Sequence, residues 1–138
     1  MISLFSGTPG SGKSLHLAQI IYNRCRFEKF TLGNFEVNRD ILDGEEWYQF
    51  IDNQDLVPEN LIEISKEYFS EHKFKEGAIV LIIDEAQLIF NVREWNLAGR
   101  SDWIHFFTQH RKLGYDIILV AQFDKMPELA IITKITKI

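Results

Sequence analysis

The sequence contains very little cysteine and no long apolar run. Its only cysteine, Cys25, cannot build a disulfide framework or a zinc cluster, and we expect it to be a small buried side chain. The longest clear apolar run, residues 78–83, is far shorter than the roughly 18 residues that a membrane-spanning helix needs. The opening MISLFSG also lacks the features of a signal peptide. These absences predict a cytoplasmic domain with no membrane span in this segment.

Charge and histidine spacing argue against two further classes of protein. The formal net charge is −5, so we expect no broad basic surface that grips nucleic acid, and any contact with DNA must be local. No stripe of aromatic and basic residues is visible along the chain. The four histidines show no metal-ligand spacing with one another or with Cys25, which argues against a zinc site.

Hydrophobic patterning predicts a single domain over residues 1–138. A chain of 138 residues with 46% hydrophobic content can bury one core but is too short for two ordinary domains. The expected strands are residues 2–6, 30–37, 78–83 and 116–121, and the expected helices are residues 14–27, 43–52, 58–72 and 101–113. The stretch 91–99 is expected to be irregular, and residues 124–138 fit a helix or a strand almost equally well.

The alternation of strands and helices predicts an α/β fold with a mainly parallel central sheet. Parallel strands need long crossover connections, and these are normally right-handed helices. The run AIVLII at residues 78–83 is apolar throughout, as in a strand that is covered on both faces. We therefore expect three layers, with helices flanking the sheet and this strand in its middle.

The strongest chemical signal is the stretch GTPGSGKS at residues 7–14. It satisfies the pattern G-x-x-x-x-G-K-[ST] of a P-loop (Walker A) and lies between a predicted strand and a predicted helix, which disfavours a chance glycine-rich turn. The loop N–H groups and the helix N-terminus favour nucleotide phosphates. We expect Lys13 to reach the β and γ phosphates and Ser14 to ligate Mg²⁺. The expected nucleotide-binding residues are Gly7, Thr8, Pro9, Gly10, Ser11, Gly12, Lys13, Ser14 and Leu15.

Two adjacent carboxylates follow the apolar run at residues 78–83. Asp84 and Glu85, in IIDEAQ, are expected at the carboxyl edge of the sheet, where open α/β folds hold ligands. This looks like a Walker B motif, in which Asp84 holds the Mg²⁺ shell and Glu85 orients or deprotonates the attacking water. The second carboxylate favours hydrolysis over simple nucleotide binding. The plain alternative is two acidic residues at the start of a solvated loop.

Two more candidates lie near the last predicted strand. Gln122 follows it and can hydrogen-bond a γ-phosphate or the attacking water as a sensor does, or it can simply cap the strand. Arg111 precedes the strand and is a candidate for stabilising transition-state charge on nucleotide bound by a neighbouring subunit. It is also an ordinary surface arginine near a helix end. Arg93 and Arg100 are weaker candidates for the same role.

The order of motifs resembles one family closely. GTPGSGKSLHL, IVLIIDEAQ, REWN and HRKLGYDIILVAQ follow one another as in the zonular occludens toxin (Zot)-like proteins, which include the assembly ATPases of filamentous phages. The resemblance covers residues 2 to about 127. Family members commonly have histidine where Lys112 stands, which is one departure from the pattern.

The resemblance implies a RecA/FtsK-like P-loop NTPase of the FtsK and HerA class. This chain would be its N-terminal ATPase domain, followed in a longer protein by a membrane-spanning helix, and so would work at the cytoplasmic face of the inner membrane. The implied activity is Mg²⁺-dependent ATP hydrolysis by a homo-oligomeric ring that drives extrusion of filamentous phage. The implied partners are a phage single-stranded DNA–protein complex and membrane assembly proteins. By position, the resemblance supports the roles given above to Lys13, Ser14, Asp84, Glu85 and Gln122, and that of Arg111 in trans.

Several other functions share part of this pattern. A nucleotide kinase usually needs an arginine-rich lid and an acceptor pocket, and a GTPase should carry N-K-x-D, which is absent. The motif set suits additional-strand ATPases better. An AAA-type DNA-helicase loader or remodeller is the alternative motor and predicts a following helical lid domain. A module that binds ATP as an ordering ligand without turnover is the alternative from another class.

Overall fold

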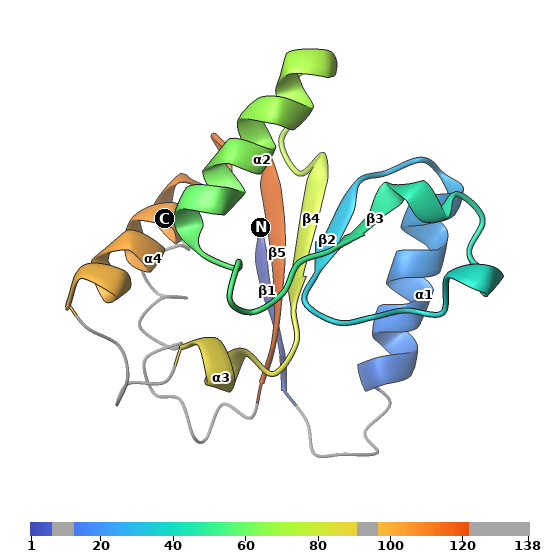
Figure 1. The fold of residues 1–138 in the computed structure, drawn as a ribbon, viewed down its shortest axis with the longest axis horizontal. Helices are drawn as coiled ribbons and strands as arrows, with labels where there is room; N and C mark the ends of the chain where they lie inside the picture. Colours follow the sequence, from blue (N-terminus) through green and yellow to red (C-terminus); the bar gives the residue numbers. More distant parts are fainter. Residues whose placement is uncertain (7–12, 91–96, 122–138) are drawn as a thin grey trace.

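The computed structural model describes residues 1–6, 13–90 and 97–121, and strands and helices alternate along them (Figure 1). The strands are β1 Ile2–Ser6, β2 Thr31–Gly33, β3 Tyr48–Phe50, β4 Ile79–Ile83 and β5 Tyr115–Ala121. The α-helices are α1 Lys13–Arg26, α2 Pro58–Glu71, α3 Ala86–Ile89 and α4 Leu97–Gln109, with short 3₁₀ turns η1 Arg39–Ile41 and η2 Glu45–Trp47. Strands 2–6, 78–83 and 116–121 and helices 14–27 and 58–72 are therefore confirmed to within one residue at each end.

The five strands form one parallel sheet in the order β1-β5-β4-β2-β3. The central strand is β4, as its continuous apolar sequence predicts. Its neighbour β5 lies between β4 and β1, with Ile83 opposite Leu119 and Leu119 opposite Leu4. Because all pairs are parallel, every strand of this sheet ends at the same edge. We call this edge, where the strands end, the carboxyl edge, and the opposite one the amino edge.

Helices cover both faces of the sheet and give the predicted three layers. In Figure 1, α1 lies on one face, while α2, α3 and α4 lie on the other. The sheet has a hydrophobic core on each face, and alternate side chains of the central strands pack into one or the other. Leu81 packs on the side of α2 and α4, and Val80 and Ile82 pack on the side of α1. Cys25 is buried against α1's side of the sheet, as expected.

The helix predicted at residues 43–52 is wrong. The chain there forms η2 and then β3, which pairs with β2. Tyr48 is 2% exposed, and its hydroxyl donates to the carbonyl oxygen of Phe35 at 2.6 Å. A Cβ on Gly33 would approach the Tyr48 hydroxyl to 2.2 Å, so only glycine leaves room for this ring beside β2. Cross-strand packing of aromatic residues favours the strand over the helix here.

Three other boundaries differ from the prediction. The second strand was expected over residues 30–37 but β2 ends at Gly33, after which the Asn34 side chain replaces the backbone ladder. The helix α4 starts at Leu97, inside the stretch that was expected to be irregular, and ends four residues before 113. The short helix α3 had no prediction. Residues 124–138 lie outside the described part of the chain.

Candidate functional site

The predicted site residues follow strands that end side by side. β1 leads toward residues 7–12, β4 leads into Asp84 and Glu85, and β5 leads toward Gln122. The register pairs Ser6 with Ala121, so the connections after β1 and β5 leave the sheet at the same level. Residues 7–12 and Gln122 themselves lie outside the described residues. The topology thus brings the predicted Walker A and Walker B segments to one edge of the sheet.

Helix α1 begins at this edge with Lys13, and Ser14 is its second residue. It has 14 residues, and no acidic residue lies in its first turn. No carboxylate of that turn therefore neutralises the positive end of the helix dipole or accepts from the first N–H groups of the helix. Leu15, also predicted to contact nucleotide, is 68% exposed. This helix end can attract an anion such as a phosphate.

Asp84 directly follows β4 and is half-buried. Its Oδ1 accepts a hydrogen bond from the Glu85 N–H at 2.9 Å. Among the described residues, no donor contacts its Oδ2. One carboxylate oxygen is therefore held by the backbone of the turn, while the other is available to a cation or a water molecule.

Asn34 clamps the backbone of Asp84 and was missed in the sequence. Its Oδ1 accepts from the Asp84 N–H at 2.7 Å, and its Nδ2 donates to the Asp84 carbonyl oxygen at 2.9 Å. The same Nδ2 also donates to Oδ1 of Asn53, which follows β3, at 2.9 Å. A polar amide directly after a short strand could have indicated this role. The strand predicted over residues 30–37 was too long, so Asn34 was placed inside it.

Glu85 occupies a strained turn between β4 and α3. Its φ of 51° and ψ of 46° place it in the left-handed region, which is unfavourable for a residue with a side chain. The side chain is exposed, and Gln87 Nε2 donates to its Oε2. Gln87 Oε1 is buried and has no hydrogen-bond partner among the described residues. Backbone outliers of this kind concentrate at functional sites, and this one lies at the predicted catalytic carboxylate.

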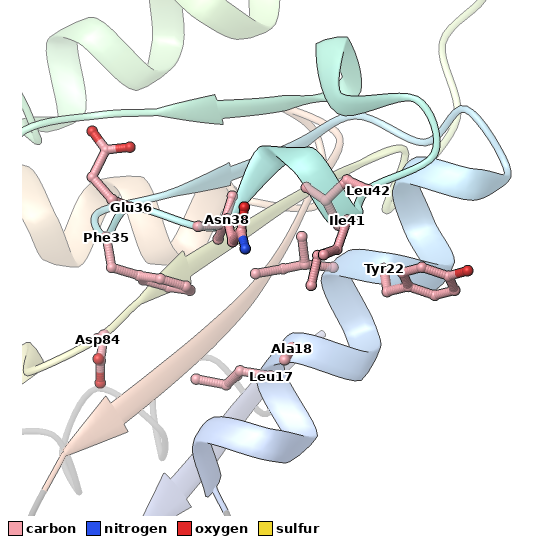
Figure 2. A pocket seen from close by; sticks show the side chains of 11 residues that line it. Leu17, Ala18, Tyr22, Phe35, Glu36, Asn38, Ile41, Leu42 and Asp84 are labelled. Atoms are coloured by element: carbon pink, nitrogen blue, oxygen red, sulfur yellow. The ribbon is translucent and has the colours of Figure 1, made fainter.

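A cavity of about 280 Å³ opens beside Asp84, between α1 and the segment 35–42 (Figure 2). Leu17 and Phe35 lie on opposite sides of it near Asp84, and Tyr22 lies at its far end. Its lining is otherwise mostly apolar, with Glu36 and Asn38 as the other polar members, and Figure 2 shows the Glu36 carboxylate pointing away from the space. No described lysine or arginine lines the cavity.

The arginine candidates lie elsewhere. Arg111 is exposed in the turn between α4 and β5, which is at the amino edge. It therefore lies before β5, at the opposite end of this strand from Gln122. Arg111 can reach a carboxyl edge only if that edge belongs to a second copy. Arg100 belongs to α4, of which only the backbone is described at that position, and Arg93 lies outside the described residues.

The described residues hold neither a cluster of metal-ligating side chains nor a membrane-spanning helix. Within residues 1–6, 13–90 and 97–121, no group of three or more His, Cys, Asp or Glu side chains is arranged to hold a metal ion. Over the same residues, none of the helices is both long enough and apolar enough to cross a bilayer.

Comparison with known proteins identifies the family. Residues 1–134 match the family model described as zonular occludens toxin (Zot). The chain belongs to the Zot family. The Gene 1 proteins of enterobacteria phages fd and M13 are each 38% identical to it over 63 residues, which is 46% of this chain. That match spans only 18% of the length of each Gene 1 protein.

Solved structures support the same fold. The N-terminal domain of zonular occludens toxin from Neisseria meningitidis superposes with a TM-score of 0.52 and 20% identity, covering 91% of this chain and 68% of that one. The pCW3 conjugation coupling protein TcpA, solved as a monomer with ATPgS, gives a TM-score of 0.56 at 16% identity, covering 88% of this chain and 42% of that one. The chain is thus a Zot-family member with the predicted three-layer, parallel α/β fold of P-loop proteins.

Proposed function

We propose that residues 1–138 form the Mg²⁺-dependent, ATP-binding and ATP-hydrolysing domain of a Zot-like phage assembly or export motor. One observation carries the proposal: a P-loop sequence and an Asp-Glu pair follow β1 and β4 of the same parallel sheet, so both leave it at the carboxyl edge. Family membership supports it, as does the ATPgS in the TcpA structure, since TcpA shares this fold.

Nucleotide binding is assigned to the P-loop and the start of α1. The triphosphate would lie against residues 7–14, with the Lys13 ammonium neutralising phosphate charge and the helix N-terminus adding its dipole. Leu15, which is exposed beyond these residues, would contact the nucleotide from the first turn. This site binds the anionic part of ATP without requiring any net positive charge on the rest of the chain.

The oxygen donors at this edge fit Mg²⁺. A hydroxyl and a carboxylate, from Ser14 and Asp84, are the hard ligands that this ion prefers in phosphate sites, and one Asp84 oxygen is not engaged by any described residue. Bound there with ATP, the ion would neutralise charge that develops on the phosphates. Asn34 would keep the Asp84 backbone in place while the carboxylate is in use.

Glu85 would orient or deprotonate the attacking water, because its exposed carboxylate lies directly after Asp84, with one oxygen accepting from Gln87 Nε2. Gln122, directly after β5, would contact the γ-phosphate or that water. The transition-state charge would be stabilised by Arg111 of a neighbouring subunit, since the Arg111 of the same chain lies at the amino edge. The active form would therefore be a homo-oligomer, for which we propose a ring.

The partners are proposed from family membership alone. The Gene 1 proteins are phage proteins, and this chain corresponds to a minor part of their length. We propose that the domain is the N-terminal part of a longer protein acting at the cytoplasmic face of the inner membrane. There it would work on a phage single-stranded DNA–protein complex together with membrane assembly proteins.

Alternative functions are less well supported. A nucleotide kinase would need cations for an acceptor phosphate, whereas the cavity beside Asp84 is mostly apolar and no described cation lines it. An AAA-type helicase loader would share the P-loop but belongs to another family than the one matched. A module that binds ATP without turnover remains the main competitor, and it makes no use of Glu85.

The test separates nucleotide binding from hydrolysis with two substitutions. Lys13→Ala removes the cation facing the phosphates and should weaken Mg-ATP binding by about ten-fold or more, as expected for loss of a charge-assisted contact. Glu85→Gln keeps the size of the side chain and should leave the dissociation constant within about two-fold while lowering kcat by about 100-fold or more. Equilibrium titration and steady-state phosphate release give the two readouts.

Lys66→Ala is the matched control, because Lys66 is an exposed lysine on α2 that pairs only loosely with Glu63. It should change neither readout. Equal loss of ATP binding in Lys13→Ala and Glu85→Gln would contradict the assigned roles. Tight binding with no turnover in the wild type at any protein concentration would support the non-hydrolysing module.

A further inference from the structure

The three connections that enter β2, β4 and β5 lie next to one another at the amino edge, opposite the proposed ATP site. Val80 N–H donates to the Phe30 carbonyl at 3.2 Å, and Ile79 N–H donates to the Gly114 carbonyl at 3.0 Å. Arg24 ties two of them together by donating to the carbonyls of Phe30 at 2.9 Å and Ala78 at 3.2 Å. Figure 1 shows these connections at the upper end of the sheet, with α3 at the other end. We call residues 26–29, 73–76 and 111–112 the amino-edge loops.

The amino-edge loops concentrate positive charge on an acidic protein. Six of the 15 Lys and Arg residues of the chain lie in them, against two carboxylates, whereas the whole chain has a net charge of −5. All six cations are exposed. They are Arg26, Lys29, Lys73, Lys75, Arg111 and Lys112, and the carboxylates are Glu28 and Glu76. Nearby Asp116 is already paired, because its Oδ1 accepts from the N-terminal ammonium at 2.8 Å. The edge therefore offers a local field that attracts a polyanion.

Two phenylalanines are exposed among these cations. Phe27 is 66% exposed and Phe74 is 48% exposed. The Arg26 guanidinium carbon lies 5.9 Å from the centre of the Phe27 ring, and the Phe74 ring packs against Phe69 with 5.0 Å between centres. Phe74 lies between two lysines in KFK, and Phe27 follows Arg26 and precedes Lys29 by two positions in RFEK. Exposed planar rings between cations suit a ligand that is both charged and aromatic.

We propose that the amino-edge loops bind single-stranded nucleic acid. Phe27 and Phe74 would stack on unpaired bases, and the five cations other than Arg111, which the proposed function places at the ATP site of a neighbouring subunit, would contact backbone phosphates. A duplex would hide its base faces from these rings, so the ligand is single-stranded. The inference rests on the proposed function for the class of partner, and it adds the surface that would take such a strand, which lies at the edge of the sheet opposite the proposed ATP site. No stripe was visible in the sequence because the two basic-aromatic segments are far apart in the chain and come to the same edge of the sheet only when β2 pairs with β4.

The test is fluorescence anisotropy with a labelled oligothymidylate of about 20 nucleotides, without ATP, between about 50 and 200 mM salt. Saturable binding is expected, with an affinity that falls as salt rises at a log–log slope of magnitude about 3 or more. The double variant Phe27→Leu with Phe74→Leu keeps apolar side chains but removes the ring planes, and should bind about ten-fold or more weakly. The double variant Lys73→Glu with Lys75→Glu should weaken binding further and reduce the salt slope. Lys66→Glu, which changes the same charge on α2, is the control and should bind like the wild type.

Three outcomes would overturn the proposal. The first is no saturable binding by the wild-type protein at the lowest salt. The second is equal binding by the leucine double variant together with equal competition by heparin, a polyanion without bases, since charge alone would then explain the binding. The third is a variant-dependent change in sedimentation with no oligonucleotide binding, which would assign the loops 26–29 and 73–76 to contacts between copies. Thermal melts verify folding of each variant, and because no nucleotide is added, a failure of the ATPase proposal would not affect the result.

Discussion

At the scale of single residues, the Asn34 side chain holds the backbone beside the proposed ATP site. One amide side chain satisfies both the N–H and the carbonyl of Asp84 and reaches Asn53 with its second proton. The backbone of Asp84 is thereby fixed where the β2–β4 ladder ends. A carboxylate held in this way loses little freedom when it takes up a cation, so Asn34 should influence Mg²⁺ use without contacting the ion.

Replacement of Asn34 should therefore change Mg²⁺ dependence. Asn34→Leu keeps a similar volume but leaves the N–H and carbonyl of Asp84 without their partners, and should lower the free energy of unfolding by about 1–3 kcal/mol. The Mg²⁺ concentration for half-maximal turnover should rise about ten-fold, as for loss of other outer contacts around metal ligands. Asn53→Ala is the control: it removes only the outer hydrogen bond and should leave Mg²⁺ dependence unchanged. Identical Mg²⁺ curves for Asn34→Leu and Asn53→Ala would contradict the positioning role.

At the scale of elements, the motifs could be placed from the sequence because each follows or begins a strongly patterned segment. The run before Asp84 is apolar throughout and occupies the centre of the sheet, and the helix after the P-loop starts at Lys13. The prediction failed where tertiary packing decides the structure. Tyr48 forms a strand because Gly33 leaves room for its ring, and α3 depends on a left-handed turn at Glu85 that no local pattern announces.

The junction of α4 with β1 and β5 also depends on tertiary contacts. His110 is 2% exposed; its Nδ1 lies 2.6 Å from the Phe107 carbonyl, and its Nε2 lies 3.1 Å from the N-terminal amine. Burial lowers the pKa of His110, and the N-terminal ammonium and Arg111 lower it further, whereas the Phe107 hydrogen bond and Asp116 act in the opposite direction. The folded protein therefore holds this imidazole neutral, with Nδ1–H donating and Nε2 accepting.

This junction should make stability depend on pH. The unfolded chain binds a proton at His110 near pH 6.5, and the folded chain does so only at lower pH. Stability should thus be lost as pH falls through about 6.5, and the loss should level off below the lowered pKa of the folded state. In urea unfolding between about pH 7.5 and 5.5, the stability advantage of the wild type over His110→Gln should shrink, by at most about 1.4 kcal/mol for the one pH unit below 6.5. An advantage that stays constant or grows on acidification would contradict the account.

At the scale of the whole molecule, the two edges of the sheet carry different chemistry. Within the described part of the chain, five carboxylates follow the strands at the carboxyl edge, in Glu36, Asp52, Asp55, Asp84 and Glu85. Six cations and two exposed rings lie before the strands at the amino edge. One edge suits a divalent cation with its nucleotide, and the loops 26–29 and 73–76 at the other edge suit a polyanion. The turn that holds Arg111 would face the carboxyl edge of a neighbouring copy, and such head-to-tail contacts close into rings when the rotation permits.

The most direct measurement is steady-state ATP hydrolysis with Mg²⁺ across a range of protein concentrations, for the wild type and Glu85→Gln. We predict that wild-type turnover per subunit rises with concentration, because Arg111 must reach the site of a neighbouring subunit. Glu85→Gln should stay about 100-fold or more below the wild type at every concentration. Equal rates for the two proteins, or no wild-type turnover under conditions where ATP is bound, would contradict the assignment of an ATPase site to the carboxyl edge.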